Sequence, residues 1–217
     1  MNIAGRREVR SFARRERPLG RAALAARERL WERLGVPEGQ WGHLGEGPRD
    51  VFLDIGFGDG ESLLTSAASD AGRDYVGVEV YRTGVIKVLR GIEERALGNV
   101  RLIEADAHDL LGKVGEGRIA AIQVFFPDPW PKTRHHKRRL VQERFLREVV
   151  RVLRPGGLFH MATDWTPYAQ AVLDAAREVP ALVLAGEERG QRPCTRFERR
   201  GVRLGHEVRD LRFHKAA

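Results

Sequence analysis

The sequence predicts an α/β fold in which a mostly parallel sheet is covered by helices on both faces. Between residues 51 and 178, short apolar segments alternate with segments whose apolar residues recur every three or four positions. This is the pattern of alternating strands and helices. The first apolar segment runs directly into three alternating glycines, as strand-to-helix turns often do. Acidic residues lie at or near the ends of three successive strands, at the edge of a parallel sheet where ligands bind.

An arginine-rich extension precedes the predicted sheet. Residues 1–20 show no periodicity, so we expect an irregular arm there. Residues 21–34 carry leucine and tryptophan at helical spacing and predict an amphipathic, arginine-rich helix, which either only docks on the core or also contacts RNA. Residues 35–50 contain five glycines and two prolines and predict a linker. We therefore expect two parts, an extension over residues 1–49 and a main domain over residues 50–217.

The main domain opens with a strand over residues 51–55 and a helix that begins at residue 61 or 62. Gly56, Gly58 and Gly60 lie between them, and glycine lets a backbone approach a ligand closely. Backbone amides at a helix start also suit polar or anionic groups. The spacing departs from the G-x-G-x-x-G pattern of dinucleotide-binding proteins, which argues against a nicotinamide-dependent dehydrogenase. An ordinary tight turn is the alternative interpretation.

Three carboxylates lie at or near the ends of successive strands. Asp54 is in the first strand, Glu79 is near the end of the second, and Asp106 directly follows the third. The second and third strands are predicted over residues 75–80 and 100–105, with a helix over residues 82–96 between them. Carboxylates gathered at one edge of a sheet would bind a cationic or hydroxyl-rich cofactor.

Residues 126–139 contain the densest group of functional residue types. They follow a strand over residues 120–126, and three prolines within five residues restrict their backbone. We therefore expect Asp128 and Trp130 to be held in place, where a carboxylate beside an aromatic plane suits a flat, hydrogen-bonding ring. The basic residues that follow suit phosphate: Lys132, Arg134, Lys137, Arg138 and Arg139, with His135 and His136 among them. A nucleobase on a phosphate backbone fits both features, whereas a proline-rich turn before a solvated basic helix is the alternative.

The last third of the chain completes the alternation. Helices are predicted over residues 140–153 and 168–178, and strands over residues 158–163, 183–185 and 207–213. The strand that ends at residue 163 is followed directly by Asp164. Residues 195–201 are polar apart from Phe197, and we expect a solvated loop there.

The single cysteine, Cys194, excludes an internal disulfide framework and a cysteine-cluster metal site. No apolar run approaches twenty residues, and the N-terminal segment lacks the apolar block of a signal peptide. We therefore expect a soluble, cytoplasmic protein without a membrane partner.

Positive charge is concentrated in three segments. Residues 1–33 carry a net charge of +6, residues 132–139 carry +5 and residues 189–217 carry +6, against +8 for the whole chain. The rest of the chain is therefore acidic, with a net charge of −9. If the fold brings the three basic segments onto one face, they form an electrostatic surface for nucleic acid. The alternative is that they point in different directions and only keep the protein soluble.

Taken together, these motifs resemble the bacterial tRNA (guanine-N7-)-methyltransferase family over nearly the whole chain. The sequence Phe-Pro-Asp-Pro-Trp-Pro-Lys at residues 126–132 is highly specific to that family. Asp-Ile-Gly-Phe-Gly at residues 54–58, Thr-Asp-Trp at residues 163–165 and Thr-Arg-Phe-Glu-Arg-Arg-Gly at residues 195–201 occur in the expected order. Arg-Ser-Phe at residues 10–12 is similar too.

The resemblance implies a class I methyltransferase fold, a Rossmann-like arrangement whose seven-stranded sheet has its last strand antiparallel. It also implies S-adenosylmethionine as the cofactor, tRNA as the partner, no metal, and methylation of guanine 46 in the variable loop. Residues 50–217 would then be the methyltransferase domain.

Residue roles carry over by position. The cofactor-binding residues that the resemblance implies are Asp54, Gly56, Gly58, Glu79, Asp106 and Asp128. Asp128 is also the implied catalytic residue. The implied substrate site comprises Lys132, Asp164, Thr195, Arg196, Phe197 and Glu198, and the implied RNA contacts are Arg134, His135, His136, Lys137, Arg138 and Arg139. Two positions depart from the family, because Asp54 stands where glutamate is more common and Arg196 where lysine is common.

The chemistry of N7 methylation agrees with these residue types. Guanine N7 is an acceptor without a proton, so it needs no strong general base. Asp128 could instead fix the ring and stabilise the positive charge that develops on it. Two alternatives remain: a methyltransferase acting on an exocyclic amine, which usually carries differently placed prolines, and a non-catalytic RNA-binding module, which would not need three carboxylates at the strand ends.

Overall fold

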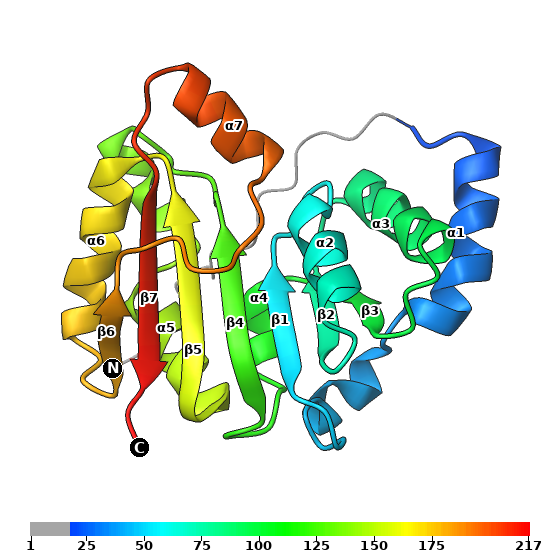
Figure 1. Ribbon diagram of the computed structural model, residues 1–217, viewed down its shortest axis with the longest axis horizontal. Coiled ribbons are helices and arrows are strands. Elements are labelled where there is room, and N and C mark those ends of the chain that lie inside the picture. Colours follow the sequence, from blue (N-terminus) through cyan, green and yellow to red (C-terminus); the bar gives the residue numbers. More distant parts are fainter. Residues whose placement is uncertain (1–17) are drawn as a thin grey trace, which may run out of the picture.

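The strands lie in the order β3-β2-β1-β4-β5-β7-β6 in the computed structural model, which describes residues 18–217 (Figure 1). β7 runs antiparallel to both of its neighbours, β5 and β6, and the other paired strands are parallel. The strands are β1 (Val51–Ile55), β2 (Asp74–Val78), β3 (Val100–Ile103), β4 (Ile119–Phe125), β5 (Leu153–Thr163), β6 (Leu182–Gly186) and β7 (Arg209–Lys215). The predicted class I arrangement, a seven-stranded sheet with its last strand antiparallel, is confirmed.

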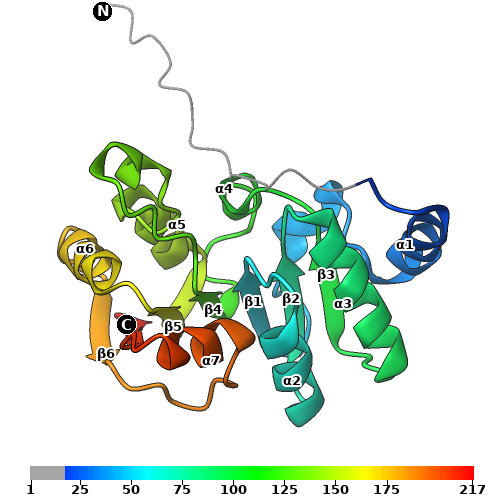
Figure 2. The same ribbon diagram turned by 90° about the horizontal axis from the view of Figure 1, so that it is seen from above.

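Helices cover both faces of this sheet (Figure 2). The α-helices are α1 (Arg21–Leu34), α2 (Glu61–Ser69), α3 (Arg82–Glu94), α4 (Ala107–Leu111), α5 (Glu143–Val152), α6 (Thr166–Arg177) and α7 (Arg196–Arg203). Two short 3-10 helices, η1 (Glu38–His43) and η2 (Thr133–Arg138), precede β1 and α5.

Two apolar cores hold the layers together. One core joins the sheet to α4, α5 and α6, and the other joins it to α1, α2 and α3. In α5, Phe145, Val149 and Val152 are fully buried because their three- and four-residue spacing places them on one side of the helix. Leu30 and Leu34 do the same for α1, which therefore docks on the core as predicted.

Most predicted elements are present within a few residues of their expected ends, and the structure differs from the prediction at four places. The linker over residues 35–50 contains η1. β5 begins at Leu153, earlier than predicted, because Leu153 already pairs with Ile119, ahead of an irregularity in the pairing of β4 with β5. α4 was not predicted. Residues 195–201 are not a loop but begin α7. The predicted arm, including residues 10–12, lies almost wholly outside the described residues, and the domain boundary at residue 49 stays a prediction.

α7 lies above the carboxyl ends of β4 and β5, at the edge of the sheet where the strands of the parallel part finish (Figure 1). Among residues 18–217, no helix is long and apolar enough to cross a membrane. The edge beneath α7 is where the glycine turn, the three strand-end carboxylates and the proline-rich segment come together.

Candidate active site

The glycine turn after β1 forms one wall of a cavity of about 450 Å³. Gly56 and Gly58 have φ values of 75° and 55°, which side chains rarely adopt. A Cβ atom at either position would meet nothing within 4 Å, so both glycines leave open space above the backbone. The turn therefore offers a ligand direct access to backbone groups at the start of α2.

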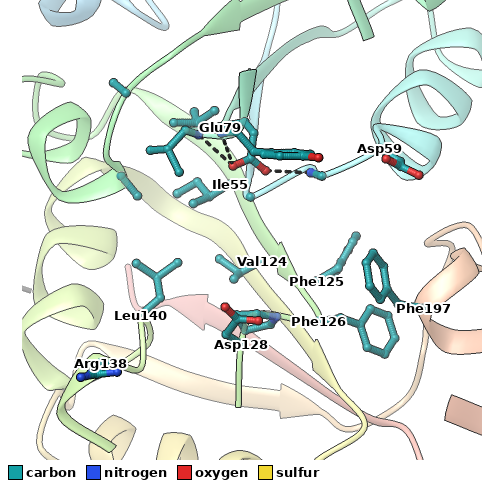
Figure 3. Close-up of a pocket in the computed structure, with 18 of the residues that line it drawn as sticks. Ile55, Asp59, Glu79, Val124, Phe125, Phe126, Asp128, Arg138, Leu140 and Phe197 are labelled. Carbon is teal, nitrogen blue, oxygen red and sulfur yellow. Dashed lines mark hydrogen bonds between the residues drawn. The ribbon is translucent and has the colours of Figure 1, made fainter. Parts of the chain in front are cut away.

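Glu79 shapes this turn through hydrogen bonds to the backbone. Its Oε2 accepts from the amide of Gly58 at 2.9 Å, and its Oε1 accepts from the amides of Val80 at 2.8 Å and Tyr81 at 3.1 Å (Figure 3). Each carboxylate oxygen has more than one acceptor site, so the group can still take a hydroxyl. Glu79 lines the cavity and ties the glycine turn to the segment that follows β2.

Asp54 is buried beneath the same turn, with only 2% of its surface exposed. Its Oδ2 has no hydrogen-bond partner within the described part of the chain, and neither does the nearby Oγ of Ser62. Both residues line a second hollow that adjoins the glycine turn. Burial raises the pKa of the Asp54 carboxyl to about 7, and the negative charge of Glu79 adds to this effect. A hydrogen bond with the Gln123 side chain opposes this rise, and the remaining oxygen, Oδ2, suits a cationic ligand group.

The proline-rich segment forms the opposite wall of the cavity. Phe126, Asp128, Trp130 and Arg138 all line it, and Asp128 is itself exposed. Phe126 and Trp130 have φ values of 54° and 44°, an uncommon conformation for bulky residues that is found at functional sites. The Arg138 guanidinium lies 5.0 Å from the Trp130 ring. Asp128 and Trp130 thus line the same cavity, as the predicted grouping of a carboxylate with an aromatic plane requires, and Figure 3 shows Asp128 on the side opposite Glu79.

Arg139 departs from the expected RNA contacts because it is buried, with 4% of its surface exposed. Its Nε donates to the Pro129 carbonyl at 2.9 Å, and its guanidinium lies 4.8 Å from the Tyr168 ring. Arg139 thus fixes the backbone between Asp128 and Trp130 instead of facing solvent. The other predicted contacts, Arg134 to Arg138, form η2, and Lys132 directly precedes it.

α7 covers the cavity from the other side. Thr195 caps its start by accepting a hydrogen bond from the Glu198 amide at 3.2 Å. Arg196 and Phe197 line the cavity, and Phe197 is 53% exposed. The side chain of Glu198 instead points inward to Arg192, at 2.6 Å. Only part of the predicted substrate set therefore faces the cavity.

α7 is also attached to the start of α2. The Arg196 amide donates to Glu61 Oε2 at 2.7 Å, and Arg199 donates to Glu61 Oε1 at 2.7 Å. The Arg199 pair lowers the pKa of the Glu61 carboxyl. These contacts hold α7 over the glycine turn.

The last two predicted carboxylates lie beside the cavity without lining it. Asp106 caps α4, with its Oδ1 accepting from the His108 amide at 2.8 Å, and its neighbours Ala105 and Ala107 do line the cavity. Asp164 Oδ2 lies 3.2 Å from Nδ1 of His206, beneath α7. Among residues 18–217, no group of three or more acidic, cysteine or histidine side chains is placed to hold a metal.

Comparisons with known proteins agree with this arrangement. A family model described as a putative methyltransferase matches residues 48–211. The tRNA (guanine-N(7)-)-methyltransferase of Alkalilimnicola ehrlichii is 47% identical over 97% of this chain and 94% of its own length. The enzyme of the same name from Nitrosococcus oceani is 42% identical, over 97% of this chain and 92% of its own.

Solved structures show the same fold at low sequence identity. The 16S rRNA methyltransferase KamB has a TM-score of 0.60 at 18% identity, covering 83% of this chain and 94% of its own. A 16S rRNA (adenine(1408)-N(1))-methyltransferase from Catenulisporales acidiphilia, solved with its cosubstrate, has a TM-score of 0.55 at 16% identity, covering 84% of this chain and 92% of its own.

Proposed function

This chain belongs to the tRNA (guanine-N(7)-)-methyltransferase family, and on that premise we propose that it methylates N7 of guanine 46 in the variable loop of tRNA. S-adenosylmethionine is the methyl donor. The observation that carries the proposal is the meeting of the glycine turn, Glu79 and Asp128 around one cavity. We propose that the protein works in the cytoplasm.

The residues of the site fit the cofactor. Gly56 and Gly58 leave open space where a Cβ would otherwise intrude, and Glu79 retains acceptor sites for ribose hydroxyls. The Asp54 carboxyl is buried and its Oδ2 has no hydrogen-bond partner among residues 18–217, so that oxygen suits the cationic end of an amino acid. We propose that these residues hold the cofactor, with Asp106 supporting the wall beside it through the cap of α4.

The proposed role of Asp128 follows from the chemistry of the acceptor atom. When bound, S-adenosylmethionine supplies an electrophilic methyl group on a positively charged sulfur. N7 attacks through a lone pair and has no proton to lose, so Asp128 is not required as a strong base. Its carboxylate would accept hydrogen bonds from guanine N–H groups and stabilise the charge that methylation places on the ring. Holding N7 in line contributes up to about 7–11 kcal/mol in favourable cases.

The surroundings of the cavity support an RNA substrate. η2 carries Arg134, Lys137 and Arg138 on one side of the opening, and α7 carries Arg196 on the other. Phosphates of a tRNA would contact these groups while the exposed ring of Phe197 offers a stacking surface for a base. We propose that Lys132, Asp164 and Thr195 belong to the same substrate site.

Methyl transfer from labelled S-adenosylmethionine to unmodified tRNA tests the proposal. The product is then treated with reagents that cleave RNA only at N7-methylguanosine, and the cleavage site is mapped. We expect one cleavage, at position 46, and none in a matched tRNA that carries adenine at that position. The matched tRNA controls for label that is transferred elsewhere.

Each remaining alternative has its own outcome in this assay. Label without cleavage would mean that another atom is methylated, as in an enzyme acting on an exocyclic amine. Absence of both label and cofactor binding would favour an RNA-binding module. Cleavage at another guanine in place of position 46 would support N7 methylation and overturn only the assignment to position 46.

A further inference from the structure

A buried ionic cluster lies behind α7 and is centred on Arg192. The side chain of Arg192 is 2% exposed, and it donates to both carboxylate oxygens of Asp210, from Nε at 2.5 Å and from Nη2 at 2.7 Å. Its Nη1 donates to Glu198 Oε2 at 2.6 Å. His160 completes the cluster, with Nε2 2.8 Å from Asp210 Oδ1. One guanidinium thus joins β7 to the first turn of α7, and β5 is attached to the same carboxylate through His160.

The same guanidinium contacts the segment that leads to Asp128. It lies 5.5 Å from the centre of the Phe125 ring and 5.6 Å from that of Phe126. Phe125 also packs edge-on against His160, with their ring centres 5.1 Å apart. Phe126 has the strained, positive φ at which β4 turns into the proline-rich segment. Arg192 is therefore placed between the two walls of the cavity, α7 on one side and the end of β4 on the other.

We propose that Arg192 is a positioning residue that sets the distance between α7 and the Asp128 segment, and thereby the place of the target base. It lines neither hollow, so it acts through other residues and does not touch the substrate. This inference rests on the proposed function, because its main readout is methyl transfer to tRNA.

The geometry of the cluster explains why an arginine is needed there. A guanidinium presents five donors in a rigid, planar fork, so it can bind one carboxylate with two hydrogen bonds and still reach a second. Its flat face also packs on aromatic rings. A lysine ammonium has the charge but neither the fork nor the face. The attraction is strong enough that, despite burial, the Arg192 and His160 contacts lower the pKa of Asp210 to about 2.

The test compares Arg192→Met, Arg192→Lys and Asp210→Asn in the full-length protein. For each variant we would measure kcat and KM for unmodified tRNA at saturating S-adenosylmethionine, the Kd of the cofactor, and the melting temperature. We expect Arg192→Met to lower kcat by about 100-fold, the loss typical of a misplacement of about 1 Å, with cofactor Kd unchanged. Arg192→Lys should fall in between. Asp210→Asn should also lower kcat, although Asp210 does not line the cavity.

Arg189→Met is the matched control. Arg189 lies in the same connection and also faces Glu198, but at 3.6 Å and with 43% of its side chain exposed. Its replacement removes the same charge, together with a hydrogen bond from Arg189 Nε to the Arg192 carbonyl at 3.2 Å, but leaves the guanidinium contacts of Arg192 in place. We expect its kcat to stay at the wild-type value. Limited trypsin digestion gives a second readout. Loss of the Arg192 contact with Glu198 should loosen α7, and so speed cleavage after Arg199 and Arg200, in the Arg192 variants but not in Arg189→Met.

The outcomes separate this inference from the proposed function. Wild-type kcat in folded Arg192→Met and Arg192→Lys would overturn it and leave the cluster as a stabilising contact. Should Arg192→Met fail to fold, Arg192→Lys decides, because its retained charge still compensates Asp210. A wild-type protein that does not methylate tRNA would contradict the proposed function instead. Trypsin digestion would then test this inference, because cleavage of α7 at the wild-type rate in the Arg192 variants would overturn it.

Discussion

Asp128 and Glu79 are both carboxylates of the cavity, but they have different surroundings. Glu79 is engaged by three backbone amides, whereas Asp128 is exposed on a segment fixed by Arg139. The side chain of Asp128 is therefore able to face a substrate while its backbone stays in place. Arg139, which the sequence groups with the RNA contacts, contributes by holding Pro129.

Replacing Asp128 should affect turnover more than cofactor binding. We expect Asp128→Ala to lower kcat by about 10²–10³-fold, the usual loss on removing one stabilising group from a transition state. Asp128→Asn keeps the shape and one acceptor but loses the charge, so its kcat separates charge stabilisation from ring positioning. Asp109→Asn, an exposed carboxylate on α4 that does not line the cavity, is the control. Equal losses of kcat and cofactor affinity in Asp128→Ala would contradict the catalytic role.

The buried carboxyl of Asp54 should make stability depend on pH. Its pKa is about 7 in the folded protein and 3.8 in the reference state, so the folded protein binds the proton more tightly. Its stabilising contribution is complete below about pH 4 and is lost as the pH rises through 7. We therefore expect the unfolding free energy of the wild-type protein to fall by an amount on the order of a few kcal/mol over this range, and Asp54→Asn to abolish this fall. Urea unfolding between pH 5 and pH 8 measures it, and parallel curves for the two proteins would argue against the shift.

At the scale of elements, the glycine turn and α7 are two boundaries of the cavity that side chains attach to the rest of the fold. The turn is held by Glu79, and α7 is held by Glu61 through Arg199 and through the Arg196 amide. Both attachments are made by acidic side chains close to the amino end of α2. Substitutions in either element should therefore weaken ligand binding more than they lower the stability of the fold.

Gly58→Ala and Gly117→Ala form a matched pair that separates backbone strain from occupied ligand space. Their φ values are 55° and 64°, and a Cβ at either position would meet nothing within 4 Å. Only Gly58 lines the cavity. Both variants should lose about 1–2 kcal/mol of stability, but only Gly58→Ala should weaken S-adenosylmethionine binding, by about tenfold or more. Calorimetric titration measures this, and equal cofactor affinity in both variants would contradict a direct contact at Gly58.

The sequence predicts the strands and the glycine turn well because those signals are local. Apolar runs, Gly56 and Gly58, and the prolines around Asp128 each restrict their own neighbourhood. α7 is missed because its arginines mask it and its apolar residues, Phe197 among them, are exposed. A local signal was nevertheless present, since Thr195 and Glu198 have the spacing of a capping box.

Buried charges cannot be predicted in the same way. Arg139 and Arg192 have the same composition around them as the exposed arginines of η2 and α7. What buries them is a partner far away in the chain, Tyr168 for one and Asp210 for the other. Their roles therefore follow only from the tertiary arrangement, which sequence patterns do not contain.

For the whole molecule, two of the three basic segments meet at one edge of the sheet. η2 and α7 both border the cavity, whereas residues 1–17 of the third segment lie outside the described part of the chain. The body of the protein carries the compensating acidic charge, much of it in surface ion pairs. This distribution favours a tRNA that approaches from the edge of the sheet.

The salt dependence of tRNA binding measures this arrangement. We expect the double variant Arg134→Gln, Lys137→Gln to reduce the slope of log Kd against log salt by about 1 for each phosphate that is no longer neutralised. The double variant Arg147→Gln, Arg177→Gln removes two exposed charges from α5 and α6 and should leave the slope unchanged. Filter binding at several salt concentrations gives both slopes. Equal slopes in the two variants would place the RNA elsewhere.

The insertion of β7 between β5 and β6 has a consequence for the order in which the protein is made. β6 leaves the ribosome before β7, and within residues 18–217 its only strand partner is β7. Until β7 is available, β6 and the edge of β5 that pairs with β7 have unpaired backbone groups, which favours aggregation. A released chain that ends within residues 187–208 should therefore depend on chaperones, and completion of the sheet should coincide with the arrival of Leu211 and Phe213 in the core.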